Sequence, residues 1–386
     1  MTSLIGGATL GQGLHGRTMD VHEAAKGDDD TLYAELASAS RSPPWVAWRL
    51  GEEAKPPRKM NGAEADALVR SARTATRTVA KRMDEKDAFK YELETVARVR
   101  VAYGPTGASE FTTLGALAVG KAHLAAVHVP AIGAYFIFSA RCETPLDRYS
   151  FDNGADVDEF VRDVLESFAR LHAAGMIHGD VKLDNMIRCS AAGRCKADGK
   201  ALLAGRRYRL IDWGAATEAH RDLPRRYLGG GRSRNTASPL AWFAWGLGPI
   251  AGQIAFVQHA RKQGSGLSAL ILSVEFWRLA IGAVSSSERH LARLRRMAAE
   301  RGGDTSEAAI RALVLEKHWR SFDLYNMGVI LGSLAVTTRG GAARRAALLA
   351  VAVRLTHYDH PEFCGDDAEA ALRHYGALRH GDRGKQ

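Results

Sequence analysis

Two separate stretches limit what this 386-residue chain can fold into more than any other feature of its sequence. The first stretch, residues 171–185, reads LHAAGMIHGDVKLDN, and the second, residues 208–214, reads YRLIDWG. Together they hold His178, Asp180 and Asn185 at fixed spacing, followed by an Asp-x-Gly triplet at the end of an apolar run. The number of polar residues at fixed spacing in the two stretches favours a shared structural role over a chance run of polar residues.

The two stretches resemble the catalytic loop and the metal-binding loop of eukaryotic-type protein kinases, whose pattern is H-R-D-L-x-x-x-N followed by D-F-G. Trp213 replaces the usual Phe, and in this it is similar to the corresponding motif of casein kinase II. The resemblance implies an α+β, two-lobed protein kinase-like fold. A small β-rich lobe would cover residues 1–140 and a larger helical lobe residues 141–386, with ATP between the lobes.

The resemblance also implies a role for each polar residue of the two loops. Asp180 would orient the acceptor hydroxyl and take its proton, and Lys182 would contact the phosphate as in serine/threonine kinases. Asn185 and Asp212 would hold Mg²⁺. Phosphoryl transfer needs mainly positioning and charge neutralisation, which these residue types provide. The expected activity is ATP-dependent phosphorylation of protein Ser or Thr.

A glycine-rich stretch near the N-terminus fits the same pattern. Gly11, Gly13 and Gly16 form a G-x-G-x-x-G, in which the lack of Cβ atoms lets the backbone approach phosphates closely. Among 39 glycines such a match is weak by itself. It gains weight because a kinase has this loop first in the chain, and we therefore expect it to cover the ATP phosphates.

The next element of the pattern is a lysine on a strand, paired with a glutamate on the following helix. The run Thr78 to Lys81, TVAK, resembles the V-A-I-K element, so that Lys81 is the expected lysine. The helical spacing of the apolar residues in 87–97 presents two carboxylates as partners. We favour Glu92 over Glu94, because a Phe three residues before the Glu is common in this element.

Three apolar residues are expected to line the adenine pocket that the resemblance implies. Val79 would lie above the adenine, and Ile187, in a short strand after the catalytic loop, would close the pocket from below. Phe138, near the end of an apolar run of strand length, would form the back of the pocket.

Two segments are longer than a kinase requires. Residues 22–70, with Pro-Pro pairs and mixed charges, are expected to form a partly flexible surface insertion. Residues 240–320 are expected to form a helical insertion packed on the large lobe. Their uncharged part, 240–257, approaches the length of a membrane span, but its glycines and Pro249 make membrane contact the less favoured alternative. An apolar segment at 267–284 and a separate basic helix at 287–301 follow.

Several departures from the kinase pattern bear on substrate and control. Gly179 replaces the Arg that receives an activation-loop phosphate in many kinases, so activity should not depend on such phosphorylation. The resulting H-G-D also resembles small-molecule kinases of the aminoglycoside phosphotransferase type. Lys182 and Asp323, which resembles the helix Asp that braces the catalytic loop, favour a protein substrate. A nucleotide-binding pseudokinase scaffold is a third alternative, disfavoured by the complete set of polar site residues.

Charge and cysteine usage bound the partners and the compartment. The formal charge is +10, and five arginines follow Gly214, so an acidic protein substrate is expected, while binding of nucleic acid is not indicated. The four cysteines are too few and too scattered for a disulfide framework. With no apolar leader in residues 1–20, they suggest a cytoplasmic, reducing environment. The arginines are Arg221, Arg225, Arg226, Arg232 and Arg234.

A last departure from the kinase pattern lies near Pro239, where a kinase has an A-P-E motif. The Glu of this motif is missing here.

Overall fold

A computed structural model gives the structure of the chain, which is mixed α+β as predicted. It describes residues 11–13, 16–20, 32–39, 45–75, 77–142, 144–146, 149, 151, 154–189, 196–197, 200–201, 206–218, 238–244, 274–337 and 341–380. The chain divides into two compact units. The first comprises Met1–Glu143, Cys189–Arg206 and Ile211–Gly214, and the second comprises Thr144–Arg188, Arg207–Leu210 and Ala215–Gln386.

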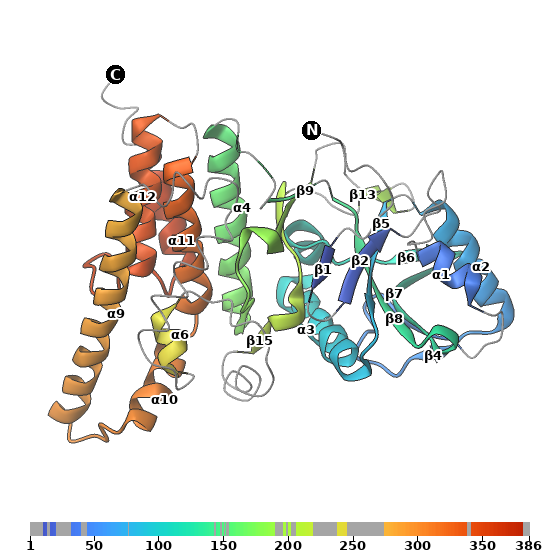
Figure 1. Ribbon diagram of the computed structural model, residues 1–386, viewed down its shortest axis with the longest axis horizontal. Coiled ribbons are helices and arrows are strands. Elements are labelled where there is room, and N and C mark those ends of the chain that lie inside the picture. The colour runs from blue at the N-terminus through green and yellow to red at the C-terminus, as the bar shows by residue number, and fades with distance from the viewer. Residues whose placement is uncertain are drawn as a thin grey trace. The chain divides into compact units, whose positions relative to one another are not determined.

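The first unit is built on an antiparallel sheet, in which the strands follow the order β1-β2-β5-β8-β7-β3-β4, and β6 pairs with β7 (Figure 1). Its strands are β1 (Gly11–Gly13), β2 (Gly16–Asp20), β3 (Val46–Arg49), β4 (Arg58–Lys59), β5 (Thr78–Met83), β6 (Leu117–Val119), β7 (Ala122–Val129) and β8 (Ala134–Ala140). A further short hairpin joins β12 (Lys196–Ala197) to β13 (Lys200–Ala201).

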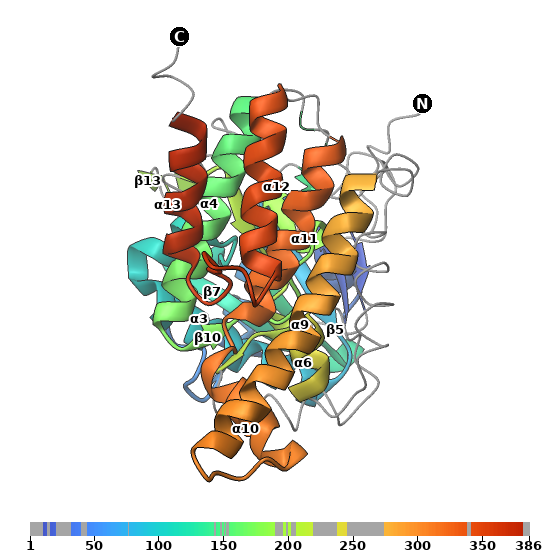
Figure 2. The same ribbon diagram turned by 90° about the vertical axis from the view of Figure 1, so that its left-hand side faces the viewer.

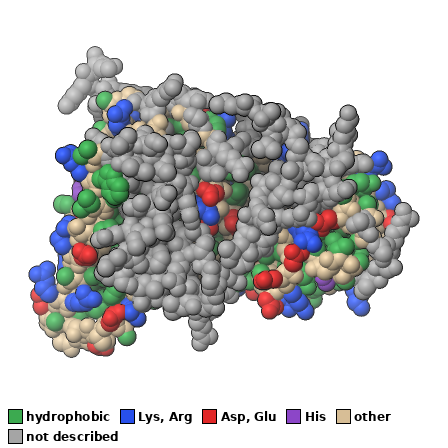
Figure 3. Space-filling view, in the orientation of Figure 1, with side chains coloured by type: hydrophobic (Ala, Val, Ile, Leu, Met, Phe, Trp, Pro, Cys, Tyr) green, Lys and Arg blue, Asp and Glu red, His purple; other side chains and the backbone are tan. Residues whose placement is uncertain are grey.

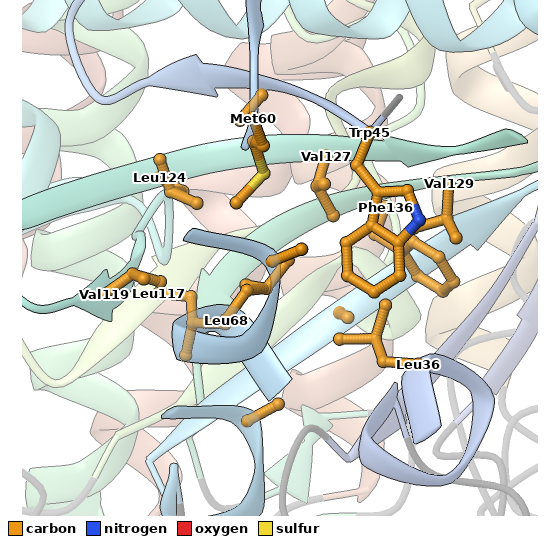
Figure 4. Packing of buried hydrophobic residues seen from close by; sticks show 14 of the residues in the cluster. Leu36, Trp45, Met60, Leu68, Leu117, Val119, Leu124, Val127, Val129 and Phe136 are labelled. Carbon is orange, nitrogen blue, oxygen red and sulfur yellow. The ribbon is translucent and has the colours of Figure 1, made fainter. Parts of the chain in front are cut away.

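Two apolar clusters form because successive side chains of a strand point to opposite faces of the sheet. On one face, α1 (Leu32–Ser38) and α2 (Gly62–Thr74) cover β7 and β8, with Leu36 and Leu68 pointing toward Val127 and Phe136 (Figure 4). On the other face, residues of α3 (Lys86–Phe111) pack against alternate positions of the same strands, among them Ile137. The sheet is therefore covered on both faces.

The prediction of a flexible surface insertion at residues 22–70 is wrong for the part that the structure describes. β3 is a strand of the main sheet, paired antiparallel with β7, and Trp45 is only 2% exposed. The following helix α2 begins with a capping box, in which Asn61 and Glu64 each accept a backbone N–H of the other. Its Leu68 is fully buried. These elements therefore supply a large share of the apolar core on one face of the sheet.

The cysteine prediction also needs correction. Cys142, just after β8, and Cys189, just after β11, form a disulfide across 47 residues of sequence, with 4.7 Å between their Cα atoms. Spacing along the chain did not indicate this pair, because the fold brings the two strand ends together. Cys364 is buried and free, and Cys195 lies outside the described residues.

The second unit is mainly helical. Helices α11 and α12 pack against each other, α13 and α4 lie beside them, and α9 packs on the other side (Figure 2). The helices are α4 (Gly154–Ala173), α6 (Pro239–Ala244), α9 (Val274–Glu300), α10 (Glu307–Lys317), α11 (Ser321–Thr337), α12 (Ala342–Thr356) and α13 (Ala368–His380). Short strands pair as β9 (Thr144–Pro145), β11 (Met186–Arg188) and β14 (Tyr208–Leu210), and as β10 (Met176–Ile177) and β15 (Thr217–Glu218).

The predicted insertion at 240–320 is helical where the structure describes it, and it packs on α11 and α12. A Cβ atom on Gly332 of α11 would clash with Leu279 of α9, so the missing side chain permits this close approach. The described part of the apolar segment, from Val274 onward, continues without a break into the basic helix predicted as separate, and together they form the single helix α9. Lys and Arg side chains gather over its lower part and around α10 (Figure 3). No helix within the described ranges is long and apolar enough to span a membrane.

Candidate functional site

In the first unit, three charged residues from distant parts of the chain form one ion cluster. Lys81 lies on β5, Glu92 on α3, and Asp212 just after β14. The Lys81 Nζ atom is 2.9 and 2.8 Å from the two carboxylate oxygens of Glu92 and 2.9 Å from Oδ1 of Asp212. Side chains along β5 point alternately to the two faces of the sheet, and this alternation brings Lys81 to the cluster. Ala80 points to the α1 and α2 face, so Lys81 points to the face covered by α3.

The two carboxylates determine the charge state of the lysine. Burial by itself would lower the pKa of Lys81, but Glu92 and Asp212 outweigh it and raise the pKa above its usual value. Lys81 is therefore a permanent cation at neutral pH. Glu92 is 5% exposed, whereas the Asp212 side chain is 42% exposed. The cluster contains one cation and two anions, so its net charge is negative. Asp212 is the more accessible of the two carboxylates, and its position suits the binding of a cation.

Glu92 is the carboxylate that contacts Lys81, as the sequence predicted. The rival, Glu94, points away with a 57% exposed side chain and lies 3.7 Å from Arg98 of the next helical turn. The catalytic role of Glu92 stays a prediction, but its position is that of a partner to the lysine.

The backbone around Asp212 has an unusual conformation. Among the residues that the structure describes, Asp212 is the one non-glycine residue with a positive φ, +60°. Asp tolerates this left-handed region better than most residues. The neighbouring Trp213 is 2% exposed and packs edge-on against Tyr103 of α3, with ring centroids 6.1 Å apart. The apolar anchor beside Asp212 therefore fixes the turn that presents the carboxylate.

The glycine-rich stretch forms a hairpin of β1 and β2, in which Gly13 pairs with Gly16 and Gly11 with Thr18. Residues 14 and 15, at its turn, lie outside the described ranges. β2 pairs in turn with β5, and Thr18 lies directly opposite Lys81. The hairpin thus lies next to the strand of the lysine, and its phosphate-covering role stays a prediction.

One of the three predicted adenine-pocket residues is misplaced. Phe138 lies on the face covered by α1 and α2, away from Lys81, where it is 1% exposed. The residue opposite Lys81 on β8 is Ile137, and it shares the face of the lysine. A shift of one residue along a strand exchanges the two faces of a sheet. Val79 shares the face of Lys81, and Ile187 lies in β11 of the second unit.

In the second unit, the predicted catalytic loop follows β10 and ends in a 3-10 turn, Leu183–Asn185. The Asn185 side-chain amide donates to the backbone oxygen of Asp180 at 2.9 Å and to its Oδ2 at 2.8 Å. Lys182 Nζ is 3.2 Å from the same Oδ2. The other carboxylate oxygen, Oδ1, is buried and accepts no hydrogen bond from any described residue. The contacts with Asn185 and Lys182 hold the Asp180 carboxylate in one position, as a general base requires.

Asp323 of α11 holds the backbone of this loop, as the sequence predicted. Its Oδ2 accepts the N–H of His178 at 2.7 Å, and its Oδ1 accepts the N–H of Gly179 at 2.9 Å. Sequence reasoning missed His172, whose Nε2 lies 3.1 Å from Oδ2 of Asp323. The sequence did contain a signal for a role of His172 near the loop, because it lies six residues before His178, at the end of an amphipathic helix. Gly179 has φ +76°, a value that glycine adopts without strain.

A buried cluster of uncharged groups joins the residue before α6, the start of α11 and the segment after α12. The Tyr358 hydroxyl is 3.2 Å from Ser238 Oγ, just before α6, and 3.0 Å from Ser321 Oγ, at the start of α11. Burial raises the pKa of Tyr358, which keeps it neutral, although the two serine hydroxyls oppose this shift. Hydrogen bonds between uncharged groups thus join these segments.

Each of the two residues predicted to bind Mg²⁺ has a suitable oxygen donor, Asn185 in the second unit and Asp212 in the first. Asn185 uses its amide nitrogen on Asp180, which leaves its amide oxygen as a ligand, and Asp212 offers a half-exposed carboxylate. Within the described residues no three His, Cys, Asp or Glu side chains gather at metal-binding distance. Such a cage is not required, since Mg²⁺ usually takes one or two protein oxygens together with substrate phosphates and water.

No known protein family matches the chain, and no curated protein matches it either. The five arginines predicted to bind an acidic substrate lie outside the described residues, as does most of the uncharged segment at 240–257.

Proposed function

We propose that the protein is an ATP-dependent serine/threonine protein kinase, with the first unit as its small lobe and the second as its large lobe. The observation that carries the proposal is the ion cluster, in which Lys81 contacts both Glu92 and Asp212. The lysine, with a 20% exposed side chain, and its two carboxylate partners come from three separate segments of the chain, so their contact requires a specific tertiary arrangement. Lysine with a helix glutamate and a metal-binding aspartate is what phosphoryl transfer from ATP needs.

The remaining roles follow from the catalytic loop. Bound Mg·ATP supplies the γ-phosphoryl group and neutralises its charge. Lys81, held by Glu92, would position the nucleotide phosphates, while Asp212 and Asn185 would hold the metal. Asp180 would orient the acceptor hydroxyl and take its proton, as the phosphoryl group passes to the acceptor oxygen and ADP leaves. Lys182 offsets negative charge beside Asp180, from which its Nζ lies 3.2 Å.

Lys182 and Asp323 support a protein acceptor, because both match the protein-kinase pattern at the catalytic loop. We propose an acidic sequence around the acceptor, given the charge of +10 and the arginines that follow Gly214. A degenerate peptide library tests this part separately. No enrichment of Asp, Glu or phosphorylated residues around the acceptor would remove the acidic preference and leave the phosphotransferase proposal intact.

One observation supports a second candidate, a kinase that acts on small molecules. Gly179 gives the H-G-D sequence typical of aminoglycoside phosphotransferases, and its positive φ is built into the loop. A panel of aminoglycosides and other small alcohols, assayed beside protein substrates, decides between the two acceptor classes.

The main experiment measures transfer of radiolabel from ATP to generic protein substrates by the purified chain. We expect transfer by the wild type and a loss of at least about a hundredfold in Asp180→Asn, because a general base contributes about 10² to 10⁴ in rate. Lys81→Met and Asp212→Asn should also be inactive. A matched control is Asp184→Asn in the same loop, 4.0 Å from Lys182 but given no role. No transfer by the wild type would refute the activity, and transfer that survives in all three site variants would show the residues to be misassigned.

A further inference from the structure

Three contacts join the segment Leu32–Thr74 to the two elements that carry Lys81 and Glu92. One reaches β5, and the other two reach α3. They are the ion pairs Glu35–Arg82 and Glu53–Arg100 and the aromatic pair Trp48–Phe89. All of them lie within the first unit. We call the described residues 32–39 and 45–74 the brace.

The first contact holds the strand of the lysine. Arg82 follows Lys81 directly in β5, and its Nε lies 2.9 Å from Oε2 of Glu35 in α1. Both side chains are mostly buried, with 21% and 14% exposed. Because β5 alternates, Arg82 is held from one face of the sheet while Lys81 contacts Glu92 on the other. The brace thus fixes β5 at the residue next to the lysine.

The second contact holds the helix of the glutamate near its start. Phe89 lies one turn before Glu92, and it is fully buried. Trp48 of β3 packs on it edge-on with 5.1 Å between ring centroids, while Tyr135 of β8 stacks on it at 4.6 Å. Phe89 of α3 is thus enclosed by aromatic side chains from β3, which belongs to the brace, and from β8. This packing restricts rotation and sliding of α3.

The third contact holds α3 two turns after Glu92. Arg100 Nε lies 2.8 Å from Oε1 of Glu53, in an ion pair rather than an aligned hydrogen bond. The side chain of Glu53 is 2% exposed and that of Arg100 16%. Arg100 also donates to the backbone oxygen of Gly115 at 3.1 Å. Burial lowers the pKa of Arg100 and Glu53 opposes this shift, so the carboxylate is the compensating charge for a buried guanidinium.

We propose that the brace is a built-in positioning device, which holds β5 and α3 in the arrangement where Lys81 contacts Glu92. Glu53 and Arg100 are its main positioning residues, since neither touches the ion cluster. This inference rests on the proposed function for its catalytic meaning.

The test compares Glu53→Gln with a control in the same loop, Glu52→Gln. Glu52 pairs with Lys55 at 3.0 Å, but both side chains are exposed, at 42% and 68%. Two quantities are measured on the full chain: amide hydrogen exchange of α3 and the dissociation constant of Mg·ATP. We expect Glu53→Gln to raise both about tenfold, the factor that corresponds to about 1.4 kcal/mol. The control should leave both unchanged.

A double-mutant cycle with Glu92→Gln separates positioning from general stability. If Glu53 acts through Glu92, Glu53→Gln weakens Mg·ATP binding in the wild type but has no further effect in the Glu92→Gln background. An equal loss in both backgrounds, or unchanged exchange in α3, would overturn the proposal. If Glu53→Gln fails to fold, the double variant Glu53→Gln with Arg100→Gln, which leaves neither charge unpaired, supplies the same measurements.

The outcomes also separate this inference from the proposed function. A wild type that neither binds Mg·ATP nor transfers phosphate would refute the kinase proposal. Faster exchange in α3 of Glu53→Gln would in that case still establish the brace as the element that holds the helix.

Discussion

Replacing Asp323 by Asn tests whether this residue holds the catalytic loop or only improves the start of a helix. The carboxylate is 1% exposed and accepts backbone N–H groups from His178 and Gly179 at 2.7 and 2.9 Å. An asparagine of the same shape has one acceptor oxygen, so one of these bonds is lost and an amide NH₂ faces a backbone N–H. A lost bond to a charged group costs about 1.5–3 kcal/mol and a buried unsatisfied donor about 1–3 kcal/mol.

We therefore expect Asp323→Asn to lower the free energy of unfolding by about 3 kcal/mol, the lower part of that combined range. Asp323 also lies in the first turn of α11, where an acidic residue favours the helix dipole by only about 0.3–1 kcal/mol. The two explanations differ enough in magnitude for urea denaturation, followed by circular dichroism, to distinguish them.

The matched control is Glu307→Gln, in the first turn of α10, where the side chain is 59% exposed and pairs with Arg311. It should lose less than about 1 kcal/mol, because it contributes only through the helix end and a surface pair. Hydrogen exchange of the His178 and Gly179 amides gives a local measurement, and both should exchange faster in Asp323→Asn. A loss of about 1 kcal/mol or less, within the helix-dipole range, with unchanged protection of both amides would refute the bracing role.

Three further predictions concern the same unit. Gly179→Ala should destabilise the protein by about 1–2 kcal/mol in urea denaturation, because an L-residue at φ +76° is strained, and a neutral result would show that this turn does not need glycine. Phosphatase treatment of active protein should leave its turnover unchanged, since Gly179 cannot pair with a phosphate; abolished turnover would show dependence on phosphorylation. Burial, together with His318 and Arg293, lowers the pKa of His290 from 6.5 to about 4, so on acidification the unfolded state takes up the proton first. Stability should fall between pH 6.5 and 4, and this fall should be smaller in His290→Gln; equal pH profiles would exclude His290 as a cause.

Much of the candidate site could be predicted from sequence, because its chemistry demands particular residue types at short spacings. The choice of Glu92 over Glu94 and the contact of Asp323 with the loop backbone are both present in the structure. Helix α4 also matches its periodicity, since a buried apolar stripe repeats every three to four residues. The two site contacts involve chemical groups that few other side chains can replace, and the helix follows from a local periodic pattern.

The errors share a different origin, namely contacts between residues far apart in sequence. Phe138 was assigned to the wrong face because a strand of apolar residues on both faces has no alternation to set its register. The pairing of Cys142 with Cys189 depends on where two strands end in space. Neither could be found from spacing along the chain.

The order of residues specifies which side chains are available for chemistry and roughly which local elements carry them. Tertiary contacts, by contrast, decide that the segment predicted as a surface insertion contributes β3 to the main sheet and braces the helix of Glu92. The physical reason is that strand pairing and buried ion pairs gain their free energy from partners distant in the chain. A single buried pair such as Glu53–Arg100 leaves no periodic signal, although it fixes the position of an entire helix.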